Sequence, residues 1–266
     1  NAKGEPNILL SINDYPNQFI NRESLDLIIT EYGIASMTGR SVRERAQALI
    51  DIAHPDDRVE LIRQAKEAKI IYADQIYISD SGALYPEFIT TTHSLKDGLN
   101  VKFRAIKPSD EEEMRRLFYR FSDTAVYYRY FSSIKAMPHE KMQEYVNVDY
   151  RRFMSIVGVI EEAGVEKIIA EGRYVRHQDR PMYADTAFVV DEYYQGKGIA
   201  SFLFNLLAKT AREQGIQTFT ADVLADNKPM LKVFEKSKLP MRAVMEYGIY
   251  NLTMPLNIED IKTTGN

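Results

Sequence analysis

The chain has 266 residues, of which 45% are hydrophobic, and a formal net charge of −4 with no cysteine. The missing cysteine excludes disulfides, thiolate metal sites and a cysteine nucleophile, and the negative charge argues against nucleic-acid binding through a basic surface. No apolar run approaches the ~18 residues of a membrane-spanning helix, and no secretory pattern opens the chain, so we expect a cytoplasmic protein with no membrane partner. The four histidines are widely separated, so we expect no metal site.

Residues 1–98 predict a small N-terminal α/β unit. An apolar strand at Leu27-Ile28-Ile29 leads into two helical patterns. Ser41 is a candidate cap for the first helix, because Glu44 follows three residues later as in a capping box. Pro55 is placed to open the second helix, since proline is tolerated in a first turn.

Part of this unit resembles a known family. Residues 27–58, with Thr30-Glu31-Tyr32-Gly33-Ile34-Ala35 and Ile52-Ala53-His54-Pro55, are similar to the extreme C-terminal part of the acetyl-CoA hydrolase/CoA-transferase family. In that family a glutamate attacks the thioester, upstream of the segment resembled here, so Glu31 does not inherit that role. The resemblance implies a partial domain without CoA-transferase activity, and a CoA-transferase domain preceding it in a longer protein as a possible partner.

From residue 99 onward the pattern predicts a second domain, 99–256, followed by a polar tail at 257–266. Val101–Ile106 alternates as a half-buried strand does, and Pro108 opens a helix with apolar residues at helical spacing. The further expected elements are a helix at Pro138–Val146, strands at Phe153–Glu161, Lys167–Val175 and Ala184–Val190, a helix at Ala200–Gln214, a strand at Gln217–Leu224, a helix at Lys228–Lys236, and strands at Arg242–Tyr247 and Ile249–Met254.

A glycine-rich loop, Gln195-Gly196-Lys197-Gly198-Ile199-Ala200, joins the strand ending at Val190 to the next helix. The first N–H groups of a helix lack intrahelical partners and carry the positive end of its dipole, so they attract an anion. Glycine lets phosphate oxygens approach the main chain closely. The loop therefore predicts a site for a pyrophosphate, although an ordinary strand-to-helix turn is the alternative.

The Gln-x-x-Gly-x-Ala spacing of Gln195, Gly198 and Ala200 resembles the acetyl-CoA loop of the GNAT acetyltransferase superfamily. The resemblance covers roughly residues 100–255 and implies an α/β (α+β) fold with a central mixed, mostly antiparallel sheet flanked by helices. It also implies acetyl-CoA as co-substrate, with its pantetheine arm in a gap beside the strand that ends at Val190. The implied donor contacts are the backbone amides of Val189 and Val190, the loop residues Gln195, Gly196, Lys197, Gly198, Ile199 and Ala200, and Asn227, which is equally well placed to cap a helix.

Two carboxylates are candidates for the general base that a protonated lysine acceptor requires. Asp185 is preferred, because bacterial protein lysine acetyltransferases of the GNAT class carry a glutamate in a segment similar to Ala184–Val190. Glu171, on the neighbouring strand, is the second candidate. Phe234 stands where the family often has a tyrosine acid, so we expect water to protonate the departing thiolate.

The acceptor side is less sharply indicated. The aromatic stretch Tyr127–Ser132, together with Asp149-Tyr150-Arg151-Arg152, looks like a segment of those lysine acetyltransferases. Transfer of an acetyl group to a protein lysine is therefore the first hypothesis, and transfer to a small amine is the second. A third is a non-catalytic module that senses acyl-CoA and regulates a CoA-transferase fused to it.

Overall fold

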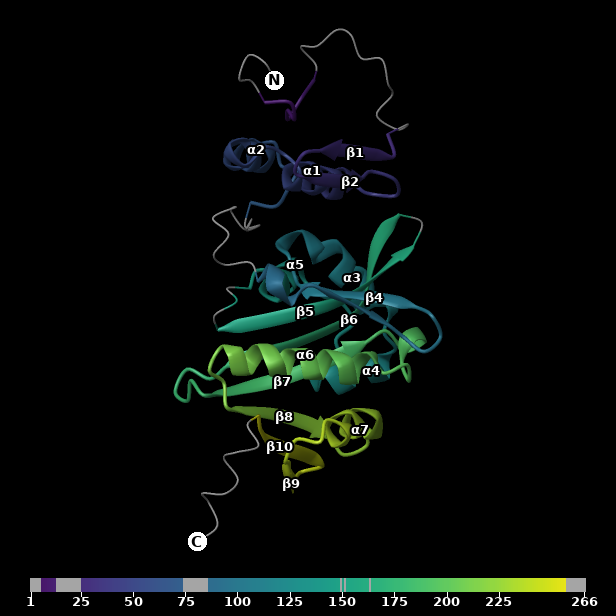
Figure 1. Ribbon diagram of the computed structural model, residues 1–266, viewed down its shortest axis with the longest axis vertical. Coiled ribbons are helices and arrows are strands. Elements are labelled where there is room, and N and C mark those ends of the chain that lie inside the picture. Colours follow the sequence, from purple (N-terminus) through teal and green to yellow (C-terminus); the bar gives the residue numbers. More distant parts are fainter. Residues whose placement is uncertain are drawn as a thin grey trace.

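The computed structural model describes residues 6–12, 25–73, 86–148, 150, 152–162 and 164–256. The expected polar tail at 257–266 lies outside these residues, as do Asp149 and Arg151. The N-terminal hairpin and its two helices stand at one end of the view, and a large sheet with its helices forms the rest (Figure 1).

The N-terminal unit follows the sequence pattern in its first strand and its two helices. A two-stranded antiparallel hairpin precedes two helices, and Ser41 and Glu44 form the expected capping box at the start of the first. Its apolar side chains make two small clusters, one around Ile50 and Leu61 and one around Ala35 and Met37. Its elements are β1 (Leu27–Thr30), β2 (Gly33–Ser36), α1 (Val42–Asp51) and α2 (Pro55–Glu67).

The rest of the described chain is built on an eight-stranded sheet of order β3-β4-β5-β6-β7-β8-β10-β9. Every neighbouring pair is antiparallel except β7 and β8, which run parallel. The sheet is therefore mixed and mostly antiparallel, as expected. Its strands are β3 (Thr91–Ser94), β4 (Asn100–Ala105), β5 (Phe153–Glu162), β6 (Val165–Arg176), β7 (Tyr183–Val190), β8 (Thr218–Leu224), β9 (Arg242–Glu246) and β10 (Ile249–Pro255).

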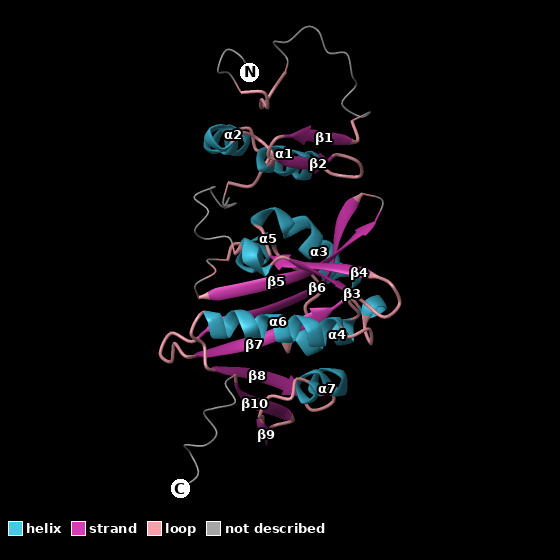
Figure 2. Ribbon diagram, viewed as in Figure 1, coloured by secondary structure: helices cyan, strands magenta, loops and turns pink. Residues whose placement is uncertain are grey.

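Helices cover both faces of this sheet (Figure 2). On one face, α6 contacts β5, β6 and β7, and its apolar side chains Leu203, Phe204 and Leu207 are completely buried with Phe219 in the larger core. On the other face a second cluster holds the helices that precede β5. The helices are α3 (Glu111–Arg120), α4 (Asp123–Tyr130), α5 (His139–Val146), α6 (Ile199–Glu213) and α7 (Lys228–Lys236).

Two strands and one α-helix were not anticipated from the sequence, and the first of them is β2 in the N-terminal hairpin. β3 joins the large sheet through β4, so residues 91–94 lie on the N-terminal side of the domain boundary expected at 99 yet pair with the second domain. α4 has a weakly amphipathic sequence, with Val126 as its buried residue, which explains why periodicity did not reveal it.

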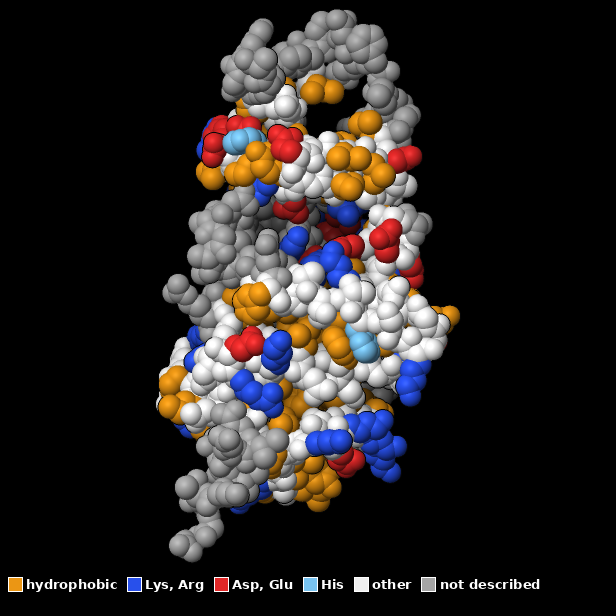
Figure 3. Space-filling model, in the orientation of Figure 1, with side chains coloured by type: hydrophobic (Ala, Val, Ile, Leu, Met, Phe, Trp, Pro, Cys, Tyr) orange, Lys and Arg blue, Asp and Glu red, His pale blue; other side chains and the backbone are white. Residues whose placement is uncertain are grey.

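Ion pairs join the N-terminal unit to the second domain. Arg43 on α1 meets Glu112 on α3 at 3.3 Å, and Glu44 meets Arg116 at 3.0 Å. The space-filling view shows charged side chains of both signs where the two parts meet (Figure 3). The contact is polar, in contrast to the apolar clusters inside each part.

Candidate functional site

The parallel strands β7 and β8 separate part-way along their length. They pair at Tyr183, Ala184 and Asp185, the last of these opposite Thr220, and no β8 partner stands beside β7 from Thr186 to Val190. The gap gives a chain or ligand access to the edge of β7. This is the separation that the sequence resemblance implied.

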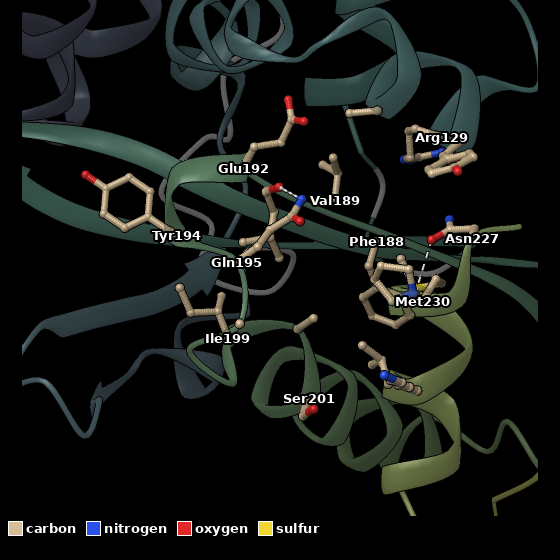
Figure 4. Close-up of a pocket in the computed structure, with 18 of the residues that line it drawn as sticks. Arg129, Phe188, Val189, Glu192, Tyr194, Gln195, Ile199, Ser201, Asn227 and Met230 are labelled. Carbon is tan, nitrogen blue, oxygen red and sulfur yellow. Dashed lines mark hydrogen bonds between the residues drawn. The ribbon is translucent and has the colours of Figure 1, made fainter.

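A cavity of about 370 Å³ occupies this region. Tyr194 and Gln195 lie at one end, and Arg129 and Asn227 lie at the other (Figure 4). The predicted donor-binding residues that line it are Val189, Val190, Gln195, Gly196, Gly198, Ile199, Ala200 and Asn227. Tyr128 and Arg129 on α4, which belong to the segment that the sequence indicates for the acceptor side, also line the cavity. Met230, Lys232 and Lys236 on α7 are lining residues for which the sequence indicated no role.

The glycine loop has the geometry of an anion site. Gly198 is the N-cap of α6 with φ +90°, and it offers no side chain to cap the first turn. Gly196 has φ +76°, and a Cβ added at either glycine would meet no protein atom within 4 Å. The first turn of α6 holds no acidic residue. The N–H groups of the first turn of α6 have no side-chain cap at Gly198, and such an arrangement suits a bound anion such as a phosphate.

The hydrogen-bond ladder fixes which amides of β7 face the gap. Asp191 donates its N–H to Ile169 O on β6, and bonded pairs alternate along an antiparallel ladder. Val189, opposite Glu171, therefore directs its amide to β6. The amides of Phe188 and Val190 point the other way, and Val190 O accepts a bond of 3.0 Å from Gln195 Nε2.

Lys197 is turned away from the cavity. Its ammonium pairs with Asp97, which lies between β3 and β4, and Lys197 does not belong to the cavity lining. This contact between residues far apart in sequence had no signal in the local pattern.

Asn227 caps a helix, which is one of the two roles expected for it, and its contact with the donor stays a prediction. Its Oδ1 accepts the N–H of Met230 at 3.2 Å and so caps α7, while the residue also lines the cavity. Phe234, where a tyrosine acid is common in the family, is 2% exposed in the main core. It packs edge-on against Phe188 and Phe204 and presents no polar group.

Asp185 lies at the point where β7 and β8 part, outside the cavity lining. Its side chain is 65% exposed, and its Oδ1 is 2.9 Å from His177 Nε2. Thr220 donates its hydroxyl to the same oxygen. Side chains alternate along a strand, so Asp185, Ala187 and Val189 share one face of β7. Asp185 is about 13 Å along the strand from Val189.

Glu171 is buried on the same face, opposite Val189 in the sheet register. Its carboxylate accepts bonds from Ser155 Oγ at 2.8 Å and Arg173 Nε at 2.6 Å, and Arg129 Nη2 lies 3.6 Å away. Burial raises the pKa of Glu171, but Arg173 and Arg129 outweigh it and hold that pKa below its ordinary value. A carboxylate so firmly ionised and bonded is a poor proton acceptor.

Comparison with known proteins agrees with this geometry. Residues 113–238 match the Acetyltransferase (GNAT) family, and residues 1–65 match the Acetyl-CoA hydrolase/transferase C-terminal domain. The chain contains a GNAT acetyltransferase domain. This domain is preceded in the chain by a segment that matches the C-terminal domain of the CoA-transferase family. Both resemblances seen in the sequence are therefore confirmed.

Three relatives illustrate the match. Acetyltransferase Pat of Mycolicibacterium smegmatis is 36% identical over 133 residues, 50% of this chain and 39% of that protein. The crystal structure of the GNAT domain of S. lividans PAT superposes with a TM-score of 0.59 at 28% identity, covering 64% of this chain and 99% of that one. Butyryl-CoA:acetate CoA-transferase of Anaerostipes caccae is 53% identical over 49 residues, 18% of this chain and 11% of that protein. The chain thus matches well under half of the length of the Pat acetyltransferase and of the CoA-transferase.

Two further observations bear on the class of protein. No helix in the described part of the chain is both long and apolar enough to cross a bilayer. Among the described residues, no three histidine, aspartate or glutamate side chains are grouped to hold a metal ion. All four histidines have other partners. His54 accepts the N–H of Asp56 and so caps α2, and His93 stacks on Phe202. His139 meets Glu111, and His177 meets Asp185.

Proposed function

We propose that this GNAT domain transfers an acetyl group from acetyl-CoA to the side-chain amine of a protein lysine. The observation that carries the proposal is the gap between β7 and β8, which leads to an uncapped helix N-terminus with two left-handed glycines. Acetyl transfer is the class of reaction that the family match indicates, and the protein lysine as acceptor is what this proposal adds.

The donor would be held along the cavity. The amides at the start of α6 would bind the diphosphate, with Gly196 and Gly198 leaving room for its oxygens. Lys232 and Lys236 line the same cavity and favour a ligand with several negative charges. The gap-facing amides of Phe188 and Val190 are suited to pair with the pantetheine arm and to donate to the thioester carbonyl, where negative charge develops during transfer.

Asp185 is the favoured group for the proton of the acceptor amine. An attacking lysine has an ordinary pKa of ~10.4 and must lose a proton as its nitrogen bonds to the carbonyl carbon and the C–S bond breaks. The carboxylate of Asp185 is exposed at the vertex of the gap, whereas Glu171 is buried and committed to arginine. Because Asp185 lies about 13 Å along β7 from Val189, the proton of the acceptor amine would reach its carboxylate through water. The CoA thiolate leaves without a tyrosine acid, since Phe234 has no proton to give.

A protein acceptor is supported by the resemblance of the Tyr127–Ser132 segment to bacterial protein lysine acetyltransferases. Two residues of this segment, Tyr128 and Arg129, line the cavity. The face that carries Asp185 is open to solvent there, which leaves room for a lysine on the surface of a large substrate.

A thiol-release assay tests the proposal, with acetyl-CoA as donor and candidate proteins, polyamines and free amino acids as separate acceptors. We expect turnover on a protein, with mass spectrometry locating acetyl groups on lysine Nε. Turnover confined to polyamines or amino acids would replace the protein acceptor with a small amine.

A second candidate is a module that binds acyl-CoA without turnover and regulates an attached CoA-transferase. The observations that favour it are the apolar Phe234 and the short side chain of Asp185. Saturable acetyl-CoA binding without turnover on any amine in that assay would support this module over the enzyme.

A further inference from the structure

Two buried guanidinium groups share one carboxylate on the acceptor face of the sheet. Arg173 bonds to Glu171 at 2.6 Å and stacks on the ring of Tyr145 at 3.9 Å, so its charge is well compensated. The Arg129 side chain is only 11% exposed, yet its one ionic contact is the longer one of 3.6 Å with Glu171. Arg129 Nε and Nη2 are buried without any hydrogen-bond partner. The cluster thus carries one positive charge that its own carboxylate does not balance.

Among the residues that the structure describes, the groups facing Arg129 supply no second anion. The neighbouring rings are those of Tyr130 and Tyr145, with centroids 5.3 Å and 5.9 Å from its guanidinium carbon. Burial raises the pKa of Tyr130 well above its ordinary value, which keeps that phenol neutral. Glu192, which also lines the cavity, is held by the N–H and hydroxyl of Ser122 and lies away from Arg129 (Figure 4).

Arg129 lines the same cavity as Phe188 and Val190, the residues whose amides face the gap. Its partner Glu171 stands opposite Val189 in the register of β6 and β7. A substrate group at the reacting end of the cavity would therefore lie beside a poorly hydrated cation. A carboxylate is the ligand that a guanidinium binds best, through two parallel N–H···O bonds.

We propose that Arg129 forms a carboxylate subsite beside the transfer centre. This proposal rests on the function proposed above and narrows its substrate. The carboxylate has two possible sources within that reaction: an acyl group that ends in a carboxylate, or an acidic side chain next to the acceptor lysine. Both would complete the charge balance that Glu171 leaves open.

Two arms of one experiment separate these sources. In the first, calorimetry compares the dissociation constants of succinyl-CoA and butyryl-CoA, whose acyl chains have equal length and differ in the terminal carboxylate. In the second, turnover of acetyl-CoA is compared on lysine peptides that carry flanking aspartate or flanking asparagine. We expect a preference of about tenfold for the carboxylate in one arm, and acetyl-CoA itself serves as the reference ligand in both.

Variants test whether Arg129 is responsible. Arg129→Gln should bring the preference close to one, and Arg129→Lys, which keeps the charge but loses the fork, should keep part of it. Lys232→Gln removes another cavity cation and should change both ligands of a pair alike, so the ratio survives. Thermal unfolding of each variant shows that it is folded.

The outcomes are distinguishable. Acetyl-CoA turnover without a carboxylate preference in either arm overturns the subsite and leaves the proposed function standing, as does a preference that survives Arg129→Gln. If acetyl-CoA does not bind the unmodified chain, the proposed function fails and this inference fails with it.

Discussion

Lys197 in the glycine loop and Asp97 in the turn between β3 and β4 form an ion pair that ties the cofactor loop to the edge of the sheet. Asp97 raises the pKa of Lys197, and Lys197 lowers that of Asp97. The ammonium is thereby held outside the cavity. For Lys197 to reach a phosphate, the pair with Asp97 must open.

The first prediction concerns this pair. Asp97→Asn should tighten acetyl-CoA binding severalfold, because no ion pair with residue 97 has to break before Lys197 contacts the phosphates. Asp97→Glu keeps the charge and should leave the dissociation constant near that of the unmodified chain. Calorimetry at low salt measures the effect, since exposed pairs are screened at high salt. Weaker binding by Asp97→Asn would show that the pair positions the loop instead.

The second prediction concerns the base. Asp185→Asn should lower kcat by about 100-fold or more while acetyl-CoA still binds, because Asp185 lies outside the cavity lining. Asp179→Asn is the matched control, since Asp179 is 82% exposed in the loop between β6 and β7. Rates on a fixed acceptor and calorimetry on the donor give the two readouts. Full activity in Asp185→Asn would remove Asp185 from the mechanism.

The third prediction concerns acid stability. The pKa of Glu171 is held low by Arg173 and Arg129 against the effect of burial, so its contribution is complete above its unfolded pKa of about 4.3 and is lost as pH falls through the lower folded value. Glu171→Gln leaves two buried guanidiniums without an anion, and we expect it to cost about 3 kcal/mol at pH 7.

The difference in unfolding free energy between Glu171→Gln and the unmodified chain should shrink as pH falls below about 4. Denaturant unfolding from pH 7 to pH 3 measures it. Glu235 lies on the exposed side of α7, so the unfolding free energy of Glu235→Gln should change with pH as that of the unmodified chain does. A difference in unfolding free energy between Glu171→Gln and the unmodified chain that stays constant with pH would mean that the arginines do not hold the carboxylate ionised.

Much of the fold could be predicted because its signals are local. The strand of Phe153–Glu162, the helix of Ile199–Glu213 and the helix of Lys228–Lys236 lie within one or two residues of the expected ranges. The strand is a mostly apolar run that ends in two glutamates, and each helix has an amphipathic stripe with a recognisable start or end. The glycine loop was found for the same reason, since its residues are contiguous.

The parts that escaped prediction depend on contacts between distant segments. The sequence assigned the donor to the amides of Val189 and Val190, but only the sheet register shows that Val189 directs its amide to β6 and that Phe188 faces the gap. The place of Arg129 in the cavity depends on α4, whose pattern is weak. The partner of Lys197 lies in a turn near β3, a strand without a clear apolar alternation.

The fourth prediction concerns the N-terminal unit. The chain should not exchange CoA between acyl donors, because its match to the CoA-transferase family is to the C-terminal domain alone and covers only residues 1–65. Incubation of acetyl-CoA with butyrate, followed by chromatography of the CoA esters, measures exchange. Butyryl-CoA formed above the background rate would contradict the expectation.

The most direct test of the whole account compares two glycines at opposite ends of α6. Gly198 (φ +90°) and Gly215 (φ +79°) both adopt left-handed backbone, and a Cβ at either meets no protein atom within 4 Å. Alanine at either position should cost about 1–2 kcal/mol in stability. Calorimetry with acetyl-CoA should show binding weakened at least about tenfold by Gly198→Ala and little changed by Gly215→Ala. Equal affinity in both variants would contradict a diphosphate site at the start of α6.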